Sequence, residues 1–300
     1  MSGYADPGYA ASLSEFGLPR RLPRSGGWLL ERPVPGGSRR DLMGPYPVFA
    51  CRNWAGLPED IDELQDGLVS VVLVADPLAP VTESQLRRAF PDRVVPFKRH
   101  HVCDLERPVG LPAHHRRHVR RASRGVEVEI CADPREYLED WTRLYAFLTA
   151  RHGLVGIHAF SPEAFRRQLA LPGLMAVRAE RDGATVGMAL WFEQAPSAHY
   201  HLAAYSPAGY EVSASYALFA VALERLRKAG VRWVDLGGAA GGASREDGLT
   251  RFKRGWANEE RTAQLCGRVL DHAAYDRLAE GHPGRWFPAY RAPDREVMGV

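Results

Sequence analysis

Hydrophobic and polar positions along this chain follow two periods, and the change from one to the other divides it into strands and helices. Short apolar or alternating runs that end at turn residues predict strands at 69–75, 96–105, 125–130, 174–180, 184–193, 198–206, 231–237 and 262–270. Apolar residues at three- and four-residue spacing predict helices at 58–64, 83–90, 112–124, 133–148, 161–171, 213–228, 249–256 and 272–280. This mixed order predicts an α/β fold, or α+β in looser usage.

Turn and cap residues mark several ends of these elements. Ser161-Pro162 has the form of an N-cap followed by proline at the first helical position. Arg181-Asp182-Gly183 separates two strand-like runs and predicts a tight hairpin, and Gly230 is a good C-cap for the helix before it. Residues 1–44 are rich in Gly, Pro, Ser and Arg, so they predict an irregular arm with a possible strand at Trp28–Val34.

Composition narrows the class of protein. With 300 residues and 45% hydrophobic residues, the chain can build about two domain cores. A net charge of +3 is too small for a dedicated nucleic-acid binder, so no DNA partner is expected.

The four cysteines are far apart, which predicts reduced thiols rather than a zinc site or a disulfide framework, and no metal is expected. The N-terminus has no apolar signal region and no run of 18 apolar residues occurs, so we expect a cytoplasmic protein without a membrane span.

One motif identifies a family resemblance. VDLGG (234–238), a glycine-rich loop and LTRFKRGW (249–256) together resemble the pattern of Fem-type transferases in the GNAT superfamily. The basic helix HHRRHVRRASRG before VEVEI also resembles the lobe boundary of that group. The resemblance implies two GNAT-like lobes, each a twisted mixed sheet flanked by helices. The first, 45–131, would be degenerate, the second, 132–275, would carry the chemistry, and 276–300 would form a tail.

The resemblance implies an N-acyltransferase that acts on a small-molecule or peptide amine. The donor would be acyl-CoA, acetyl-CoA for example, used as a co-substrate without any tightly bound cofactor. Fem-type members use aminoacyl-tRNA instead, so tRNA is a possible partner. The sequence departs from both patterns: PAGYEVSAS (207–215) has one glycine where CoA-binding loops have R/Q-x-x-G-x-G/A, and no coiled-coil arm for tRNA is visible. A catalytically inactive binding module is therefore a third possibility.

The donor site is expected where a helix begins after residues 207–215, because a helix N-terminus attracts phosphate. Gly209 would admit a ligand close to the backbone, and Ser213 and Ser215 would add hydroxyl donors. The alternative is an ordinary Pro-Gly turn with a serine cap. The resemblance places Phe252 and Lys253 near the donor and the reacting carbonyl, with Arg254 beside them.

Other polar residues are candidates for acid–base work and substrate binding. Asp235 would pair with Lys253 or Arg254, orient an amine, or hold the glycine-rich loop. Strict alternation places His201 and Tyr205 on one face of their strand and Tyr200 on the other. His201, Tyr205 and Glu193 are candidate bases or acids, or else strand packing residues. Arg117 and Arg121 belong to an arginine stripe that suits a polyphosphate, a tRNA backbone or an anionic substrate, unless it is a solvated helix face.

Overall fold

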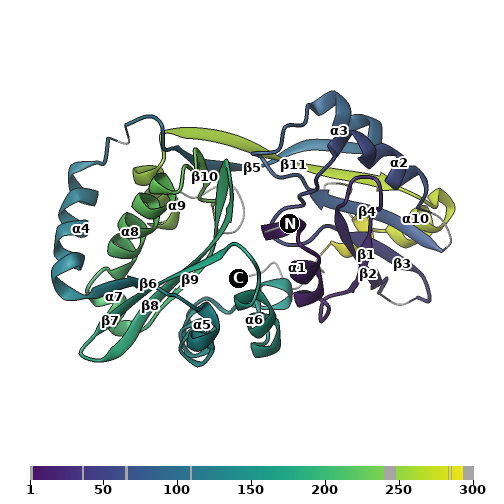
Figure 1. The fold of residues 1–300 in the computed structure, drawn as a ribbon. Helices are drawn as coiled ribbons and strands as arrows, with labels where there is room; N and C mark the ends of the chain where they lie inside the picture. Colours follow the sequence, from purple (N-terminus) through teal and green to yellow (C-terminus); the bar gives the residue numbers. More distant parts are fainter. Residues whose placement is uncertain are drawn as a thin grey trace. The chain divides into compact units, whose positions relative to one another are not determined.

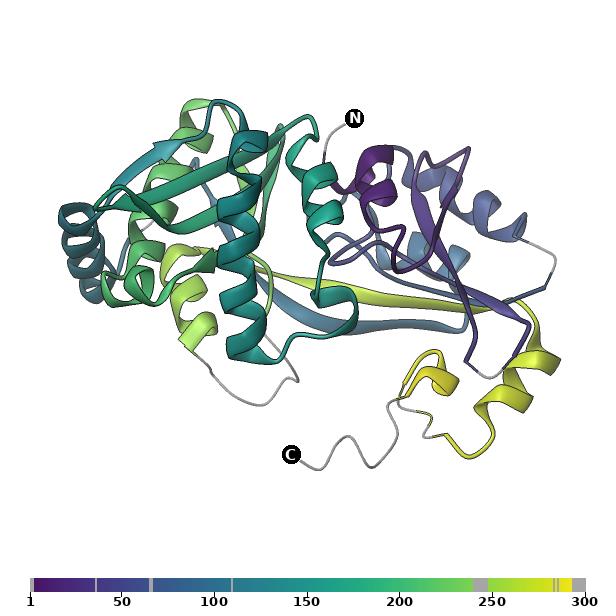
Figure 2. The ribbon, with the colours of Figure 1, turned by 90° about the horizontal axis from the view of Figure 1, so that it is seen from below.

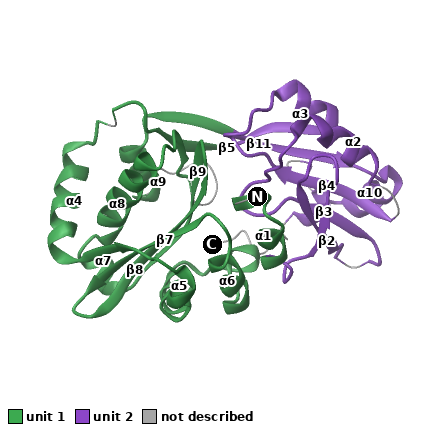
Figure 3. Cartoon of the chain, viewed as in Figure 1, with its two compact units in different colours: residues 1–12, 98–262 green, residues 13–97, 263–300 purple. Residues whose placement is uncertain are grey.

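The structure is a computed structural model that describes residues 3–35, 37–64, 67–108, 110–239, 248–282, 284 and 286–292. The chain forms two compact units (Figure 3): unit 1 holds residues 1–12 and 98–262, and unit 2 holds 13–97 and 263–300. The fold is mixed α/β, with a large twisted open sheet flanked by helices (Figure 1). These units are defined by packing, so the family-based boundaries at 44, 131 and 275 stay predictions.

Unit 1 contains a sheet with the strand order β5-β10-β9-β8-β7-β6. Neighbouring strands are antiparallel except for β9 and β10, which are parallel. The strands are β5 (Arg93–Asp104), β6 (Glu127–Ile130), β7 (Leu174–Arg181), β8 (Ala184–Gln194), β9 (Ser197–Tyr205) and β10 (Trp233–Asp235). The predicted hairpin between β7 and β8 is confirmed, because Asp182 and Gly183 have positive φ values of 53° and 75°.

Helices cover both faces of this sheet. Helices α4, α8 and α9 lie on one face, and α5 and α6 lie on the other (Figures 1 and 2). The core under α8 includes Trp191 and Phe219, which are fully buried. The helices of unit 1 are α1 (Pro7–Ser12), α4 (Ala113–Gly125), α5 (Leu138–His152), α6 (Pro162–Leu169), α7 (Pro207–Glu211), α8 (Ala214–Lys228) and α9 (Gly248–Trp256), with 3-10 turns at Gly3–Ala5, Pro134–Tyr137 and Gly156–His158.

Unit 2 contains five strands and a core of its own. Its strand order is β1-β2-β3-β4-β11, in which β3 and β4 are parallel and the other neighbours are antiparallel. Phe49 and Trp54 meet edge to face at 5.6 Å in its core. Its elements are β1 (Leu18–Arg21), β2 (Trp28–Pro33), β3 (Arg40–Met43), β4 (Leu68–Val74), β11 (Glu259–Val269), α2 (Leu57–Asp62), α3 (Glu83–Ala89) and α10 (His272–Ala279), with 3-10 turns at Trp54–Gly56 and Ala289–Arg291.

The N-terminal segment is more regular than its composition predicts. The expected strand at Trp28–Val34 is β2, but the segment also forms α1, β1 and β3. Tyr4 and Tyr9 are buried in unit 1, where their rings pack edge to face on Phe192. Aromatic burial thus orders a segment that is rich in Gly and Pro, since the apolar area removed from water offsets the cost of ordering the chain.

Two further expectations concern cysteines and the membrane. All four cysteines are free, and burial raises the pKa of each thiol to about 12. At neutral pH they are therefore protonated thiols, which are poor nucleophiles. Among the described residues, every helix is too short or too polar to span a bilayer.

Candidate active site

The sheet of unit 1 divides between β9 and β10. Strand β10 pairs with β9 only through Trp233–Asp235 and Ser197–His199, although β9 continues to Tyr205. Beyond β10 the chain turns toward β5, where the N–H of His101 donates to the carbonyl of Gly237. Among the described residues β9 and β10 therefore diverge after these three pairs, and we call this point the β9–β10 wedge.

Asp235 ends β10 at the apex of this wedge and is almost fully buried. Its Oδ2 lies 2.8 Å from Nδ1 of His100 on β5, and its Oδ1 accepts the N–H of Gly237 at 2.7 Å. Burial alone would raise the pKa of this carboxyl, but the charge and hydrogen bond of His100 outweigh burial and lower that pKa. Its hydrogen-bond partner is thus His100 rather than Lys253 or Arg254, and it also holds the glycine turn.

Lys253 reaches the same turn from α9. It is only 7% exposed, and its Nζ donates to the carbonyl of Gly238 at 2.8 Å. The same Nζ lies 5.8 Å from the centre of the Tyr200 ring on β9. His100 packs against Gly238 as well, because a Cβ built on that glycine would lie 3.3 Å from the ring. The ammonium of Lys253 is therefore placed where it can stabilise negative charge that develops at the wedge.

Phe252 lies in an aromatic cluster rather than at the wedge. Its ring centre is 4.7 Å from that of Phe219 and 4.9 Å from that of Tyr216, both on α8. Its carbonyl lies 3.0 Å from Nε2 of His115 on α4. Phe252 thus joins three helices, and this packing fixes α9 so that the next residue, Lys253, points to the glycine turn. Arg254 is exposed on the same helix.

A hollow lined by arginines lies beside the start of α8. It has a volume of about 510 Å³, and we call it the arginine hollow. Among the described residues that line it, four are arginines and none is acidic. They are Arg117, Arg120, Arg121, Arg124, Gly125 and Val212. In the described part of the chain none of these guanidinium groups forms an ion pair, although Arg121 donates to the carbonyl of Glu211 at 3.2 Å. Four uncompensated positive charges attract a polyanion.

The predicted donor loop, 207–215, forms α7 and the turn into α8. Gly209 is not open to a ligand, because a Cβ at this position would lie 2.1 Å from the carbonyl oxygen of Val186. This glycine lets α7 pack against β8. Ser213 has a left-handed backbone with φ of 60°, and its Oγ lies 3.3 Å from Nδ1 of His118. Ser215 is half-buried in the first turn of α8, where backbone N–H groups lack partners within the helix.

A bulge in β9 changes which face its side chains occupy. Leu190 pairs with Leu202, but Trp191 pairs with Tyr200, so His201 is an extra residue. Tyr205 therefore shares the α8 face with Tyr200, and the strict alternation expected from the sequence is wrong here. The two phenols hydrogen-bond, and burial raises the pKa of Tyr205 well above its ordinary value, so it can act as an acid but not as a base at neutral pH.

His201 and Glu193 are engaged in structural contacts. His201 Nδ1 lies 3.1 Å from the hydroxyl of Tyr4, and its Nε2 lies 3.2 Å from Oε1 of Gln168. Burial, followed by the charge of His199, lowers the pKa of His201 to about 3, so the ring is neutral. Glu193 is half-buried at the end of β8, with its Oε2 3.9 Å from Nη2 of Arg225. Both contacts fit the packing role that the sequence left open for these residues better than an acid–base role.

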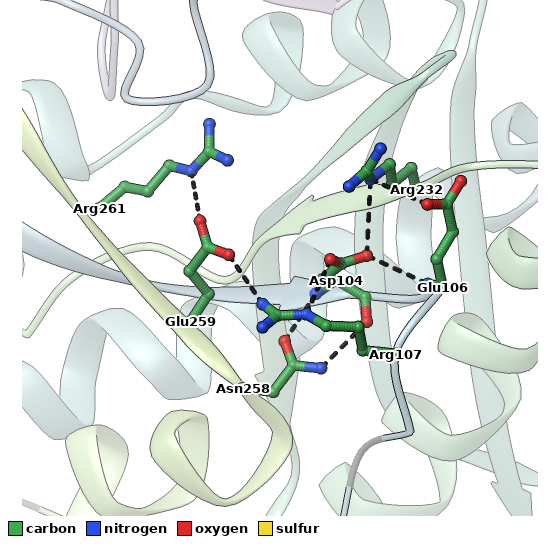
Figure 4. Close-up of polar contacts among 7 residues, drawn as sticks. All are labelled: Asp104, Glu106, Arg107, Arg232, Asn258, Glu259 and Arg261. Carbon is green, nitrogen blue, oxygen red and sulfur yellow. Dashed lines mark hydrogen bonds and ion pairs between the residues drawn. The ribbon is translucent and has the colours of Figure 1, made fainter.

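A buried carboxylate at the end of β5, Asp104, stabilises the chain beside the start of β10 (Figure 4). Asp104 at the end of β5 accepts from Nε of Arg107 at 2.9 Å and lies 3.7 Å from Nε of Arg232. Its backbone exchanges two hydrogen bonds with the side chain of Asn258, at 2.8 and 3.0 Å. These contacts hold β5 against the beginning of β11 and the approach to β10, so they fix the register that places His100 beside Asp235.

Sequence reasoning missed His100 and His115. The signal for His100 is weak: two adjacent histidines in a predicted strand must point to opposite faces. His115 is fully buried between α4 and α9 and stacks at 5.9 Å on Phe252. Its ring occupies the space that Gly255 leaves open. No local sequence pattern predicts this contact between His115 and Gly255.

Comparisons with known proteins agree with this geometry. Residues 113–254 match the family model described as an acetyltransferase (GNAT) domain. No curated protein matches by sequence. Among solved structures, FemX is similar with a TM-score of 0.66 and 13% identity, over 90% of this chain and 93% of that chain. The C-terminal domain of a putative lysylphosphatidylglycerol synthetase from Agrobacterium fabrum is similar with a TM-score of 0.60 and 16% identity, over 89% of this chain and 88% of that chain. L-PGS from Bacillus licheniformis is similar with a TM-score of 0.57 and 17% identity, over 88% of this chain and 92% of that chain.

Residues 113–254 therefore match a GNAT domain, and the likeness in fold to FemX and to the synthetase domain bears out the expected resemblance to the Fem-like branch with two lobes. This matched region contains the β9–β10 wedge, helix α8 and the DLGG turn. The fold is that of acyl- and aminoacyltransferases in general.

Proposed function

We propose that this protein transfers an aminoacyl group from aminoacyl-tRNA to the amine of a small molecule or peptide. The observation that carries the proposal is the arginine hollow beside the start of α8. Arg117 and Arg124 are seven residues apart, so the stripe extends over about 10 Å of helix. That length suits successive phosphates of an RNA strand, which pair with guanidinium groups through strong charged hydrogen bonds.

Acyl-CoA is the second candidate donor, favoured by the wedge and by the N-terminus of α8. Two observations weigh against it. The loop 207–215 has one glycine, and that residue, Gly209, faces the carbonyl of Val186 instead of a ligand. Ser213 and Ser215 remain as donors at the helix N-terminus, and they would serve either kind of phosphate. The Fem-type resemblance of VDLGG and FKRGW also implies aminoacyl-tRNA.

In the proposed reaction the acceptor amine attacks the ester carbonyl of the donor directly. Positioning lowers the barrier, and no covalent enzyme intermediate is needed. The ammonium of Lys253 stabilises the oxyanion that develops at the wedge. Arg254 is exposed one residue further along α9 and adds positive charge near the donor. Tyr205 keeps its proton at neutral pH and is suited to hydrogen-bond the donor rather than to accept a proton.

Charge reversal in the arginine hollow tests the donor. We expect Arg117→Glu with Arg121→Glu to weaken tRNA binding by at least about 100-fold, because each of the two charged hydrogen bonds contributes about 1.5–3 kcal/mol. The salt dependence of binding should also fall by a slope of about 1.4, or about 0.7 for each phosphate that is no longer neutralised. Binding is measured by fluorescence anisotropy of labelled tRNA and by calorimetry with acetyl-CoA. Arg116→Glu is the matched control, because Arg116 is exposed on α4 but does not line the hollow.

The outcomes separate the three possibilities. Loss of tRNA binding in the double variant, with Arg116→Glu unaffected, supports the proposal. Micromolar binding of acetyl-CoA together with no tRNA binding by the wild-type protein refutes it in favour of acyl-CoA. Binding of either ligand without transfer to any amine indicates an inactive binding module. Wild-type turnover by Lys253→Ala would instead argue against the role given to Lys253.

A further inference from the structure

Two histidines follow one another on β5, and only His100 is coupled to a buried carboxylate. His100 is 6% exposed, and its Nδ1 lies 2.8 Å from Oδ2 of Asp235. The other oxygen of Asp235 is held by the N–H of Gly237. The carboxylate is therefore fixed by two contacts, and it fixes the imidazole in turn.

This contact determines which nitrogen of His100 carries its proton. The pKa of Asp235 is lowered, so the group is ionised at neutral pH and can only accept hydrogen bonds. Nδ1 of His100 must then donate, which leaves the lone pair of the neutral ring on Nε2. An imidazole held in this way by a carboxylate is prepared to take a proton at Nε2.

The pair lies on the face of the sheet opposite to α8. Val234 points into the core under α8, so the next residue, Asp235, points to the other face. The arginine hollow is on the α8 side, beside α4. A role for His100 in the reaction therefore requires the donor carbonyl to reach the face of the sheet opposite to the hollow.

We propose that His100 is the general base of the transfer reaction and that Asp235 is its positioning residue. The inference rests on the proposed function. Nε2 of His100 takes a proton from the acceptor amine as the amine nitrogen forms a bond to the donor carbonyl carbon. The bond from that carbon to the ribose oxygen breaks, and the protonated His100 returns its proton to this oxygen. An amide and a free hydroxyl result, and the enzyme is unchanged.

Other candidate bases near the wedge fit less well. Tyr205 holds its proton too strongly, and both ring nitrogens of His201 face protein partners. His101 points to the opposite face from His100, with its Nδ1 3.6 Å from the exposed Glu260. Charged groups near His100 include Asp235 and, beyond the glycine turn, Lys253, while His199 lies beside Asp235 on β9.

His100→Gln tests the role with a group that can still donate to Asp235 but cannot shuttle a proton. Transfer is followed from tRNA charged with labelled amino acids to glycinamide and lysine-containing peptides. We expect kcat to fall by about 100-fold or more with little change in KM, as removal of a general base predicts. His101→Gln is the matched control on the same strand, and it should stay within about twofold of wild type. Thermal melting of each variant checks that it is folded.

Chemical rescue distinguishes a base from a structural histidine. Imidazole should restore transfer to His100→Ala, and substituted imidazoles should restore it in proportion to their basicity. A folded His100→Gln variant with wild-type kcat would overturn the role of His100 as general base, and so would rescue that does not depend on the basicity of the added imidazole. Either result would leave the proposed function intact. A wild-type protein that transfers nothing from any donor refutes the proposed function, and with it this role for His100.

Discussion

A methyl group added at Gly255 should separate α4 from α9. A Cβ built on Gly255 lies 2.0 Å from Cε1, 2.2 Å from Nε2 and 2.6 Å from Nδ1 of His115. Ordinary contact begins near 3.4 Å, so the ring must move by about 1.4 Å. It cannot move into solvent, because His115 is fully buried among Tyr216, Phe252 and Trp256.

Two opposing effects set the size of the change. Overpacking costs about 1–3 kcal/mol, and loss of the hydrogen bond to the Phe252 carbonyl costs about 1 kcal/mol. Alanine in place of glycine inside a helix stabilises that helix by about 1 kcal/mol. We therefore expect Gly255→Ala to destabilise unit 1 by about 2 kcal/mol, which lowers Tm by roughly 4–8 °C for a unit of this size.

Differential scanning calorimetry measures this change, and the same helix supplies the control. Gly248 begins α9, and no described atom lies within 4 Å of a Cβ built there. Gly248→Ala should leave Tm unchanged or raise it slightly. If Gly255→Ala melts at or above the wild-type temperature, the packing of His115 between α4 and α9 is not as described.

Two further predictions concern buried polar groups. Asp104→Ala removes a buried carboxylate that accepts from Arg107 and lies near Arg232. Both arginines are about half exposed and keep Glu259 and Glu106 as partners, so we expect the free energy of unfolding in urea titrations to fall by about 1.5–3 kcal/mol, the contribution of a hydrogen bond to a charged group; a loss below about 1 kcal/mol would show that the network in Figure 4 contributes little. His201 has a folded-state pKa of about 3 against an ordinary 6.5, so below pH 6.5 the unfolded chain binds the extra proton and stability falls as pH falls toward 3. The loss should approach about 1.4 kcal/mol per pH unit, and His201→Gln should flatten this slope; an unchanged slope would contradict the burial of a neutral ring.

The sequence by itself determined the elements whose signals are local. The proline after Ser161, the turn at Asp182-Gly183 and the glycine at Gly230 act over a few residues, and each marks an element end in the structure. The family motif also needed no coordinates, because VDLGG and FKRGW are contiguous stretches. Periodicity was enough for the α/β class, since it reports which side of each element is buried.

The tertiary structure alone decided which of these residues meet. His100 and Asp235 are 135 positions apart, and their contact depends on the register of β5 against β10. One extra residue, His201, moves Tyr205 to the other face of β9, because side chains in a strand alternate with a period of two. The neighbour of Gly209 is a carbonyl of β8 rather than a ligand, because α7 packs directly against that strand. Such contacts are fixed by long-range pairing, and a local pattern carries no information about the partner strand.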